Sequence, residues 1–266
     1  MRYFFISDVH GNYEKMVAAL EARHFDKEKD TLVSVGDPFD RGPKSREVLE
    51  YIMSCPNRIL LWGNHDRRLY LLVYRMDFYN YYDYQNGIME TFKSLAGDEY
   101  NGGIDYCLEA LQKDKLLTKY FNECCYAIEF KDLIATHAWL PYIVSNYKFG
   151  MPEAEWEYSI DPQWRDYNPK RWYEYLWCNS LGAAIKGAFP EKKLLIGHFH
   201  AWRFRERFED KNMIDKDKNI IDSSTFVLDD KLIAIDGCAS YDKGGQVNVY
   251  IYQSADEPIK YPVYQK

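Results

Sequence analysis

The chain has 266 residues, of which 47% are hydrophobic and 28% charged, and it carries a formal net charge of −7. This composition is typical of a globular protein with a sizeable core, and the acidic balance argues against duplex nucleic acid as a partner. Apolar runs fall short of the roughly 18 residues of a membrane span, and six cysteines without C-x-x-C spacing predict reduced thiols and a cytoplasmic location.

The first 66 residues alternate strand and helix patterns. Apolar runs predict buried strands at residues 3–7, 31–35 and 58–62. Between them, apolar residues recur at helical spacing over 13–20 and 48–53, and Asn12 is the expected cap of the first helix. This βαβαβ order predicts a largely parallel, buried sheet.

Residues 67–125 have a different character. Tyrosines crowd this stretch, at positions 70, 74, 79, 81, 82 and 84. We interpret it as a helical, Tyr-rich insertion over one end of the sheet, within a single domain that spans residues 1–266. An ordinary helical layer is the alternative.

Strand patterns resume in the second half of the chain. The predicted strands cover residues 126–130, 133–136, 194–197, 225–228, 232–236 and 247–252. Residues 141–175, rich in Pro, Trp and Tyr, are expected to be irregular. The charged run 203–218 is expected to be a solvated loop.

Five polar clusters each stand directly after a predicted strand. They are Asp8-Val9-His10, Gly36-Asp37 with Asp40-Arg41-Gly42, Gly63-Asn64-His65-Asp66, His137, and Gly197-His198. Because ligands bind at the carboxyl ends of strands in an open α/β sheet, we expect these side chains to converge. Carboxylate and amide oxygens mixed with imidazoles suit Mn, Fe, Zn and similar ions.

The spacing within the clusters fits metal ligation. Asp8 and His10 are expected to point the same way from an extended segment, because side chains alternate along a strand, so that one metal can bind both. Asp37 can bridge two ions with its two oxygens, and Asn64 supplies a neutral oxygen. His65 points elsewhere in this interpretation and need not be a ligand.

These motifs resemble those of the phosphoprotein-phosphatase branch of the calcineurin-like metallophosphoesterases. The matching segments are DVHGN at 8–12, GDPFDRG at 36–42, GNHD at 63–66, THAW at 136–139, GH at 197–198 and the tail IDGCASYDKGG at 235–245. The resemblance covers almost the whole chain. It implies a four-layer α/β/β/α sandwich of two mixed sheets with flanking helices, built around a di-metal centre.

The resemblance also implies the metal ligands. Asp8, His10 and Asp37 would hold the first ion, and Asp37, Asn64, His137 and His198 would hold the second. The expected cofactor is therefore two divalent ions, with manganese as the first expectation and iron, zinc, nickel or cobalt as alternatives. Such a pair can activate a shared water for in-line attack on phosphorus.

Catalytic and substrate-binding roles follow from the same resemblance. Arg41 would grip the substrate phosphate through its guanidinium fork, and His65, oriented by Asp40, would be the general acid for the leaving oxygen. His198 and His200 lie on the same side of a predicted extended segment. The family pattern favours His198 as the ligand. His200 is expected to support the metal ligands or to face the substrate, with a purely structural role as the alternative.

One position departs from the family pattern. Many bacterial and phage members carry a second phosphate-binding arginine in a W-x-R motif, where this chain has Trp177-Cys178-Asn179. Asn179 is therefore the substrate-binding residue expected there. Arg165, Arg171 or Arg203 are alternative sources of the missing charge.

Three functions are compatible with these residues. The first hypothesis is a phosphomonoesterase of the Ser/Thr/Tyr protein phosphatase type, acting on a phosphorylated protein or a small phosphoester. The alternative is a symmetrical bis(5'-nucleosyl)-tetraphosphatase or another nucleotide phosphohydrolase, for which the aromatic insertion would offer a stacking surface. A non-catalytic metal-binding scaffold is the third, supported only by the missing arginine.

Overall fold

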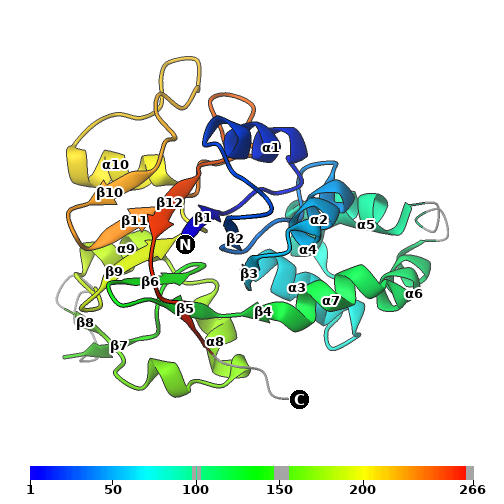
Figure 1. Ribbon diagram of the computed structural model, residues 1–266, viewed down its shortest axis with the longest axis horizontal. Coiled ribbons are helices and arrows are strands. Elements are labelled where there is room, and N and C mark those ends of the chain that lie inside the picture. Colours follow the sequence, from blue (N-terminus) through cyan, green and yellow to red (C-terminus); the bar gives the residue numbers. More distant parts are fainter. Residues whose placement is uncertain (98–99, 101–102, 147–155, 262–266) are drawn as a thin grey trace.

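The structure is a computed structural model that describes residues 1–97, 100, 103–146 and 156–261. Two mixed β-sheets lie at its centre, with helices outside them (Figure 1). The first sheet has the order β12 (Tyr250–Gln253), β1 (Arg2–Ile6), β2 (Thr31–Ser34), β3 (Arg58–Leu61) and β4 (Cys124–Cys125). The second has the order β10 (Phe226–Leu228), β11 (Leu232–Ala234), β9 (Lys193–Ile196), β6 (Leu133–Thr136), β5 (Ala127–Glu129) and β13 (Ile259–Tyr261).

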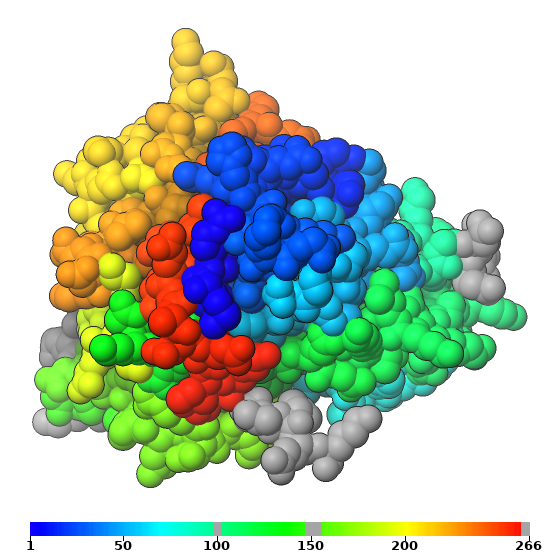
Figure 2. All heavy atoms as spheres, in the orientation of Figure 1, coloured from blue at the N-terminus to red at the C-terminus, as the bar shows by residue number. Residues whose placement is uncertain are grey.

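The strands of the first sheet pair as the βαβαβ pattern predicts. Strands β1, β2, β3 and β4 run parallel to one another, while β12 is antiparallel to β1. Figure 2 shows this last contact, where the first residues of the chain (blue) lie against the C-terminal strands (red). The parallel strands bring the loops that follow β1, β2 and β3 to one edge of the sheet.

Most of the helices fall into two groups on opposite sides of the strands. They are α1 (Tyr13–Ala22), α2 (Ser45–Ser54), α3 (Asn64–Val73), α4 (Tyr81–Gln85), α5 (Ile88–Ala96), α6 (Ile104–Lys113), α7 (Lys115–Glu123), α8 (Pro169–Tyr175), α9 (Ser180–Ile185) and α10 (Ala201–Glu209). Helices α3 to α7 gather on one side and α8 to α10 on the other (Figure 1). Within the described ranges, no helix combines the length and apolar character that crossing a membrane requires.

The side chains of β1 alternate between two buried environments. Tyr3 and Phe5 belong to the core between the two sheets, together with Ile128 of β5. Phe4 belongs instead to the cluster that contains Met16 of α1. Each sheet thus buries both faces, one against the other sheet and one against helices. The predicted four-layer α/β/β/α arrangement is confirmed.

Two segments expected to be irregular contain regular elements. Within 141–175, β7 (Tyr142–Ser145) and β8 (Glu157–Ile160) pair antiparallel and α8 follows, while 147–155 lie outside the described residues. The charged run 203–218 begins inside α10 rather than in a loop. There Phe204 is fully buried and stacks on Phe226 at a ring distance of 5.8 Å, and Ala201 and Trp202 are buried with it, so apolar residues fix a helix whose remaining residues are mostly charged.

Asn12 stands at the start of α1, as predicted, but its side chain does not cap that helix. Its Nδ2 donates to the carbonyl oxygens of Val9, at 2.9 Å, and His10, at 2.8 Å. The side chain therefore closes the turn after β1. It stabilises the loop after β1 rather than the N-terminus of the helix.

Residues 67–125 supply most of α3, all of α4 to α7, and the edge strand β4. Arg68 of α3 anchors α4 through a double hydrogen bond from Nε and Nη2 to the Asp83 carboxylate, at 2.7 Å each. The tyrosines of α4 face outward beside this anchor, with Tyr81, Tyr82 and Tyr84 between 62% and 73% exposed. That this stretch is an insertion into a single domain remains our interpretation.

Replacing Glu129 by glutamine is expected to lower the free energy of unfolding by about 2 kcal/mol at pH 7. The buried carboxylate accepts hydrogen bonds from Arg165 Nε at 2.8 Å and Nη2 at 2.6 Å, and Lys192 Nζ lies 2.8 Å away. Arg165, opposed by burial and aided by Lys192, lowers the pKa of Glu129 from 4.5 to about 2.

Because the folded pKa is the lower one, this stabilisation is complete above pH 4.5 and disappears as the pH falls towards 2. Urea unfolding should therefore show that the difference in free energy of unfolding between wild type and Glu129→Gln is about half as large at pH 3 as at pH 7. The exposed Glu50, changed to glutamine, is the matched control. An equal gap at both pH values would contradict the ion-pair account.

Candidate metal centre and active site

Polar side chains from five strand-end loops meet in one buried cluster. The loops follow β1, β2, β3, β6 and β9 and contribute Asp8, His10, Asp37, Asn64, His137 and His198. The first five are at most 3% exposed, and His198 is half-buried. Burying this many polar groups is costly unless they are paired or bind a cation.

Six residues of these loops have a left-handed backbone. Their φ angles are 50° at Asp8, 48° at His10, 55° at Asp37, 69° at Asp40, 68° at Arg41 and 60° at His198. Non-glycine residues rarely adopt this region, and such strain concentrates at functional sites. The expectation that Asp8 and His10 share one side of an extended segment is therefore wrong. Their side chains still approach, with His10 Nε2 3.9 Å from Asp8 Oδ1.

Asp37 lies at the centre of the cluster. Its Oδ2 is 3.3 Å from His137 Nε2 and 3.9 Å from Nε2 of both His10 and His65. Burial raises the pKa of Asp37, but the neighbouring imidazoles, His137 first, outweigh burial and hold it well below its usual value. A Cβ on Gly63 would stand 2.0 Å from Asp37 Oδ1, so only glycine fits against this carboxylate.

Two histidines present the same ring nitrogen to the cluster. Nδ1 of His10 lies 2.7 Å from the Phe39 carbonyl, and Nδ1 of His137 lies 2.8 Å from the Val35 carbonyl. A carbonyl only accepts, so Nδ1–H donates in both rings. When the rings are neutral, the Nε2 lone pair faces inward, which is the arrangement of a metal-ligating histidine.

The acceptors around His137 fit a cation. Asn64 Oδ1 lies 2.9 Å from His137 Nε2, close to Asp37 Oδ2, and none of these three atoms carries a proton when His137 is neutral. Burial lowers the pKa of His137, yet Asp37 outweighs it and raises the value to about 10, which expresses the demand for positive charge at this point. A divalent ion with mixed nitrogen and oxygen ligands meets that demand.

Two triplets of side chains place ligand atoms close enough to share an ion. Asp37, His137 and His198 form one, and His10, Asp37 and His65 form the other. The first lies within the set expected for the second ion. The other contains His65 where Asp8 was expected. Asp8 Oδ2 accepts from the Ser7 hydroxyl and from the His198 amide at 2.8 Å, while its Oδ1 lies 3.9 Å from His10 Nε2.

The cluster holds an excess of buried carboxylates. Burial, followed by the charge of Asp236, raises the pKa of Asp8 to about 7, and burial raises that of Asp236 to about 6. Burial and Asp37 raise the pKa of Asp66 to about 7. Bound cations would relieve this mutual repulsion, so the electrostatics of the chain also fit a metal centre.

His65 sits between an acidic and a basic partner. Its Nδ1 lies 2.7 Å from Asp40 Oδ2, and Arg41 Nη2 lies 3.2 Å from its Nε2. Burial and Arg41 lower the pKa of His65, but the Asp37 and Asp40 carboxylates outweigh them and the net shift is upward. Because arginine only donates, the contact is a hydrogen bond from Arg41 Nη2 to the Nε2 lone pair of the neutral ring. An imidazole with a raised pKa beside a guanidinium fork is a suitable pair for binding and protonating a phosphoester, once the phosphate has replaced the ring as the partner of Arg41.

The remaining expected site residues begin helices. His200 precedes α10, where burial lowers its pKa to about 4 and its ring stacks on Trp202. Asn179 Oδ1 accepts from the Gly182 amide at 2.9 Å and caps α9. His198 is left-handed, so the expected shared side of an extended segment for His198 and His200 is wrong. Substrate contact by His200 or Asn179 stays a prediction.

The three arginines considered for the missing charge differ in their surroundings. Arg165 is bound to Glu129, and Arg171 lies over the Tyr167 ring at 3.6 Å. Arg203 lies over Trp202 at 4.6 Å, and its charge contributes to the lowered pKa of His200. The charge of Arg203 thus acts on His200, which is one of the predicted substrate-binding residues.

Three residues of the site received no role in the sequence analysis, although the segments that contain them were named. Asp236 follows β11 just as the other acids follow their strands, so the strand-end rule could have found it. Asp66 binds the amides of Gly63 and Asp37 and the Tyr120 hydroxyl. Trp177 is 45% exposed with its ring 6.3 Å from that of His65, a proximity that no local pattern indicates.

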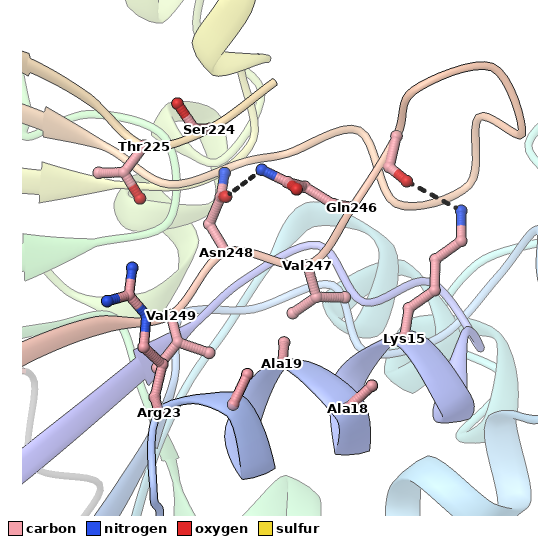
Figure 3. A pocket seen from close by; sticks show the side chains of 12 residues that line it. Lys15, Ala18, Ala19, Arg23, Ser224, Thr225, Gln246, Val247, Asn248 and Val249 are labelled. Atoms are coloured by element: carbon pink, nitrogen blue, oxygen red, sulfur yellow. Dashed lines mark hydrogen bonds between the residues drawn. The ribbon is translucent and has the colours of Figure 1, made fainter. Parts of the chain in front are cut away.

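A separate cavity of about 630 Å³ lies between α1 and residues 245–249 (Figure 3). None of its lining residues belongs to the strand-end cluster. Its Lys15 ammonium donates to the carbonyls of Ala239 at 2.7 Å and Gly245 at 3.1 Å. Because this cation already serves the backbone, we place the chemistry at the strand-end cluster.

Two mixed sheets between helical layers, with acids and histidines converging at the strand ends, define the class of metal-dependent phosphoesterases. The family model described as calcineurin-like phosphoesterase matches residues 1–220, and the chain belongs to that family. The fold supports this assignment. A crystal structure of a protein named, provisionally, as a diadenosine tetraphosphatase has a TM-score of 0.51 at 16% identity, over 100% of this chain and 95% of that one.

Other similar proteins carry two kinds of name. The symmetrical bis(5'-nucleosyl)-tetraphosphatase of Klebsiella pneumoniae is 44% identical over 140 residues, 52% of this chain and 43% of the relative. That of Coxiella burnetii is 38% identical over 140 residues, 52% and 42%. These matches span less than half of the relatives' length. A cold-active protein-tyrosine phosphatase from a Shewanella species has a TM-score of 0.51 at 15% identity, over 92% of this chain and 74% of that one.

Proposed function

We propose that this chain is a divalent-metal-dependent hydrolase that cleaves dinucleoside tetraphosphates symmetrically, giving two nucleoside diphosphates. The observation that carries the proposal is the Asp37-centred cluster beside the His65–Arg41 pair. The sequence relatives are the reason to choose the nucleotide substrate, since those of Klebsiella and Coxiella are named for it. They favour the tetraphosphatase hypothesis over that of a protein phosphatase.

In this proposal Asp8, His10 and Asp37 hold one ion, and Asp37, Asn64, His137 and His198 hold the other. The ions would supply a water-derived nucleophile and positive charge for the phosphate oxygens. Manganese is the ion that we would test first.

The remaining steps belong to side chains. Arg41 binds phosphate oxygens with its guanidinium fork and orients the scissile bond. His65 donates the proton on Nε2 to the departing diphosphate oxygen, while its Nδ1–H continues to donate a hydrogen bond to Asp40 Oδ2 at 2.7 Å. The upward shift of the His65 pKa favours the protonated form that this role needs.

Exposed aromatic rings near the cluster support a nucleotide substrate. The Trp177 ring lies beside His65, next to the place where the leaving group departs. Nucleobases stack favourably on exposed aromatic rings, at about 1–3 kcal/mol each. The exposed tyrosines of α4 belong to the segment just before Gly87, whose carbonyl oxygen accepts from the Arg41 amide at 3.4 Å.

The test compares diadenosine tetraphosphate with a phosphoserine peptide and a phosphotyrosine peptide in the presence of Mn²⁺. We expect kcat/KM to be about 100-fold or more higher for the dinucleotide, with ADP as its sole nucleotide product, because the dinucleotide adds about 3 kcal/mol of base stacking. AMP and ATP as products would contradict symmetrical cleavage. Faster cleavage of either peptide would restore the protein phosphatase hypothesis, and no cleavage of any ester would favour a scaffold.

A further inference from the structure

The two carboxylate oxygens of Asp40 have different partners. Oδ2 faces His65 Nδ1 at 2.7 Å, and Oδ1 accepts a hydrogen bond from the Thr91 hydroxyl at 2.6 Å. The backbone amide of Asp40 donates to the same hydroxyl oxygen at 2.8 Å. All three residues are at most 4% exposed. Thr91 therefore fixes both the main chain and the carboxylate of Asp40.

This contact joins distant parts of the chain. Thr91 lies in α5, 51 residues after Asp40. A threonine hydroxyl in a helix often bonds back to the carbonyl four residues earlier. Here the hydroxyl is fully committed to Asp40, both as donor and as acceptor, while that earlier carbonyl, of Gly87, accepts from Arg41. The branched side chain also restricts the rotamer, so the hydroxyl is held in place.

One face of α5 supports the loop that follows β2 and the start of α2. Positions 87, 91 and 94 are spaced as neighbours on one helix face. Gly87 receives the Arg41 amide at 3.4 Å, Thr91 binds Asp40, and the Ser94 hydroxyl receives the Arg46 amide at 2.9 Å. Helix α5 thus supports Arg41, the proposed phosphate-binding residue, and Asp40, the partner of the proposed general acid.

Asp40 needs such support, because its φ of 69° is unfavourable for a residue other than glycine. Without the Thr91 hydroxyl, a buried amide and a buried carboxylate oxygen would both lose their partner. The carboxylate would then be free to rotate away from His65. Loss of one hydroxyl would change the orientation of the imidazole two contacts away.

We propose that Thr91 is a positioning residue of the reaction, acting through Asp40 to hold His65 in the orientation of a general acid. The inference rests on the proposed phosphoester hydrolysis, but it does not depend on which phosphoester is the substrate. It gives the helical segment a role in the chemistry: α5 supplies the outer member of a Thr91–Asp40–His65 chain of hydrogen bonds.

The test uses Thr91→Val, which keeps the shape and removes the hydroxyl, and Thr91→Ser, which restores it. A general acid matters most when the leaving group is poor. We expect Thr91→Val to lower kcat about 10- to 30-fold for phenyl phosphate and less than about 3-fold for p-nitrophenyl phosphate, with KM nearly unchanged, and Thr91→Ser to recover most of the loss. Ser94→Ala, on the same helix face, is the matched control and should lower both rates by the same small factor.

Equal losses for the two esters in Thr91→Val, or no recovery in Thr91→Ser, would overturn the inference. Where Thr91→Val does not fold, Thr91→Cys serves as the second variant, because a thiol is only a weak donor. The proton spectrum of the His65 ring gives a readout without turnover. The Nδ1–H signal is identified by its absence in His65→Ala. Its chemical shift should differ from wild type in Thr91→Val and equal that of wild type in Thr91→Ser.

The two proposals fail in different ways. A wild-type protein that hydrolyses no phosphoester would contradict the proposed function, and the ring-proton spectrum would still decide the role of Thr91. A wild-type protein that hydrolyses both esters, with a Thr91→Val variant that has the wild-type ratio of rates and an unshifted Nδ1–H signal, would leave the function intact and remove Thr91 from it.

Discussion

Replacing His65 by alanine is expected to lower kcat for diadenosine tetraphosphate by about 10²- to 10⁴-fold, the range that general-acid catalysis contributes. The imidazole is the group in the cluster that combines a raised pKa, a carboxylate on Nδ1 and an Nε2 beside Arg41. Without it, the departing oxygen must leave unprotonated. Initial rates for wild type and variant under saturating Mn²⁺ give the ratio directly.

Two further measurements make this result specific. The control is His24→Asn. His24 is exposed, lies outside the site and has a left-handed backbone with φ of 56°, a conformation that asparagine tolerates. Bound manganese is counted in His65→Ala. The variant should keep the wild-type metal content; loss of an ion would show that His65 is a ligand, as the His10–Asp37–His65 triplet allows, and would contradict its role as the acid.

The second large effect is expected at Asp37. Asp37→Asn removes the one carboxylate shared by both ligand triplets, so we predict a loss of about 10³-fold or more in kcat/KM and of at least one bound ion. An amide has the same shape but no charge, so the fold of the loop should persist. Asp105, whose side chain is 81% exposed, is changed to asparagine as the matched control. Activity within about threefold of wild type in Asp37→Asn would contradict the shared-ligand account.

Buried acids link this site to folding. Asp8 and Asp66 have pKa values of about 7, far above the ordinary 3.8, so at neutral pH the metal-free fold carries repulsion that the unfolded chain does not. The strained backbone at Asp8, Asp37 and His198 adds to that cost. Ions that bind only the folded chain offset both the carboxylate repulsion and the backbone strain. The bound ions thus stabilise the site together with the fold.

The sequence predicted the parts of the site that follow from strand order. Apolar runs placed β1, β2 and β3, and parallel strands bring Asp8, Asp37 and Asn64 to one edge whatever the details of the loops. Asp236 obeys the same rule after β11. These residues could be found because periodicity and topology alone determine where a strand ends.

The local geometry could not be predicted in the same way. The left-handed backbone at Asp8 and His10 is imposed by hydrogen bonds from their amides to the carbonyls of Gly36 and Asp37, at 3.1 Å each, which only the folded chain contains. Thr91 meets Asp40 across 51 residues of chain. Such contacts depend on how whole helices dock, and no spacing within a short segment encodes them.

The central claim is that Asp37 joins two ions at the ends of parallel strands. A crystal of the protein grown with Mn²⁺ and phosphate, measured at the manganese absorption edge, tests it most directly. The account predicts two anomalous peaks about 3.5–4 Å apart on either side of the Asp37 carboxylate, with phosphate against Arg41. A single peak, or two peaks that do not share Asp37, would contradict it.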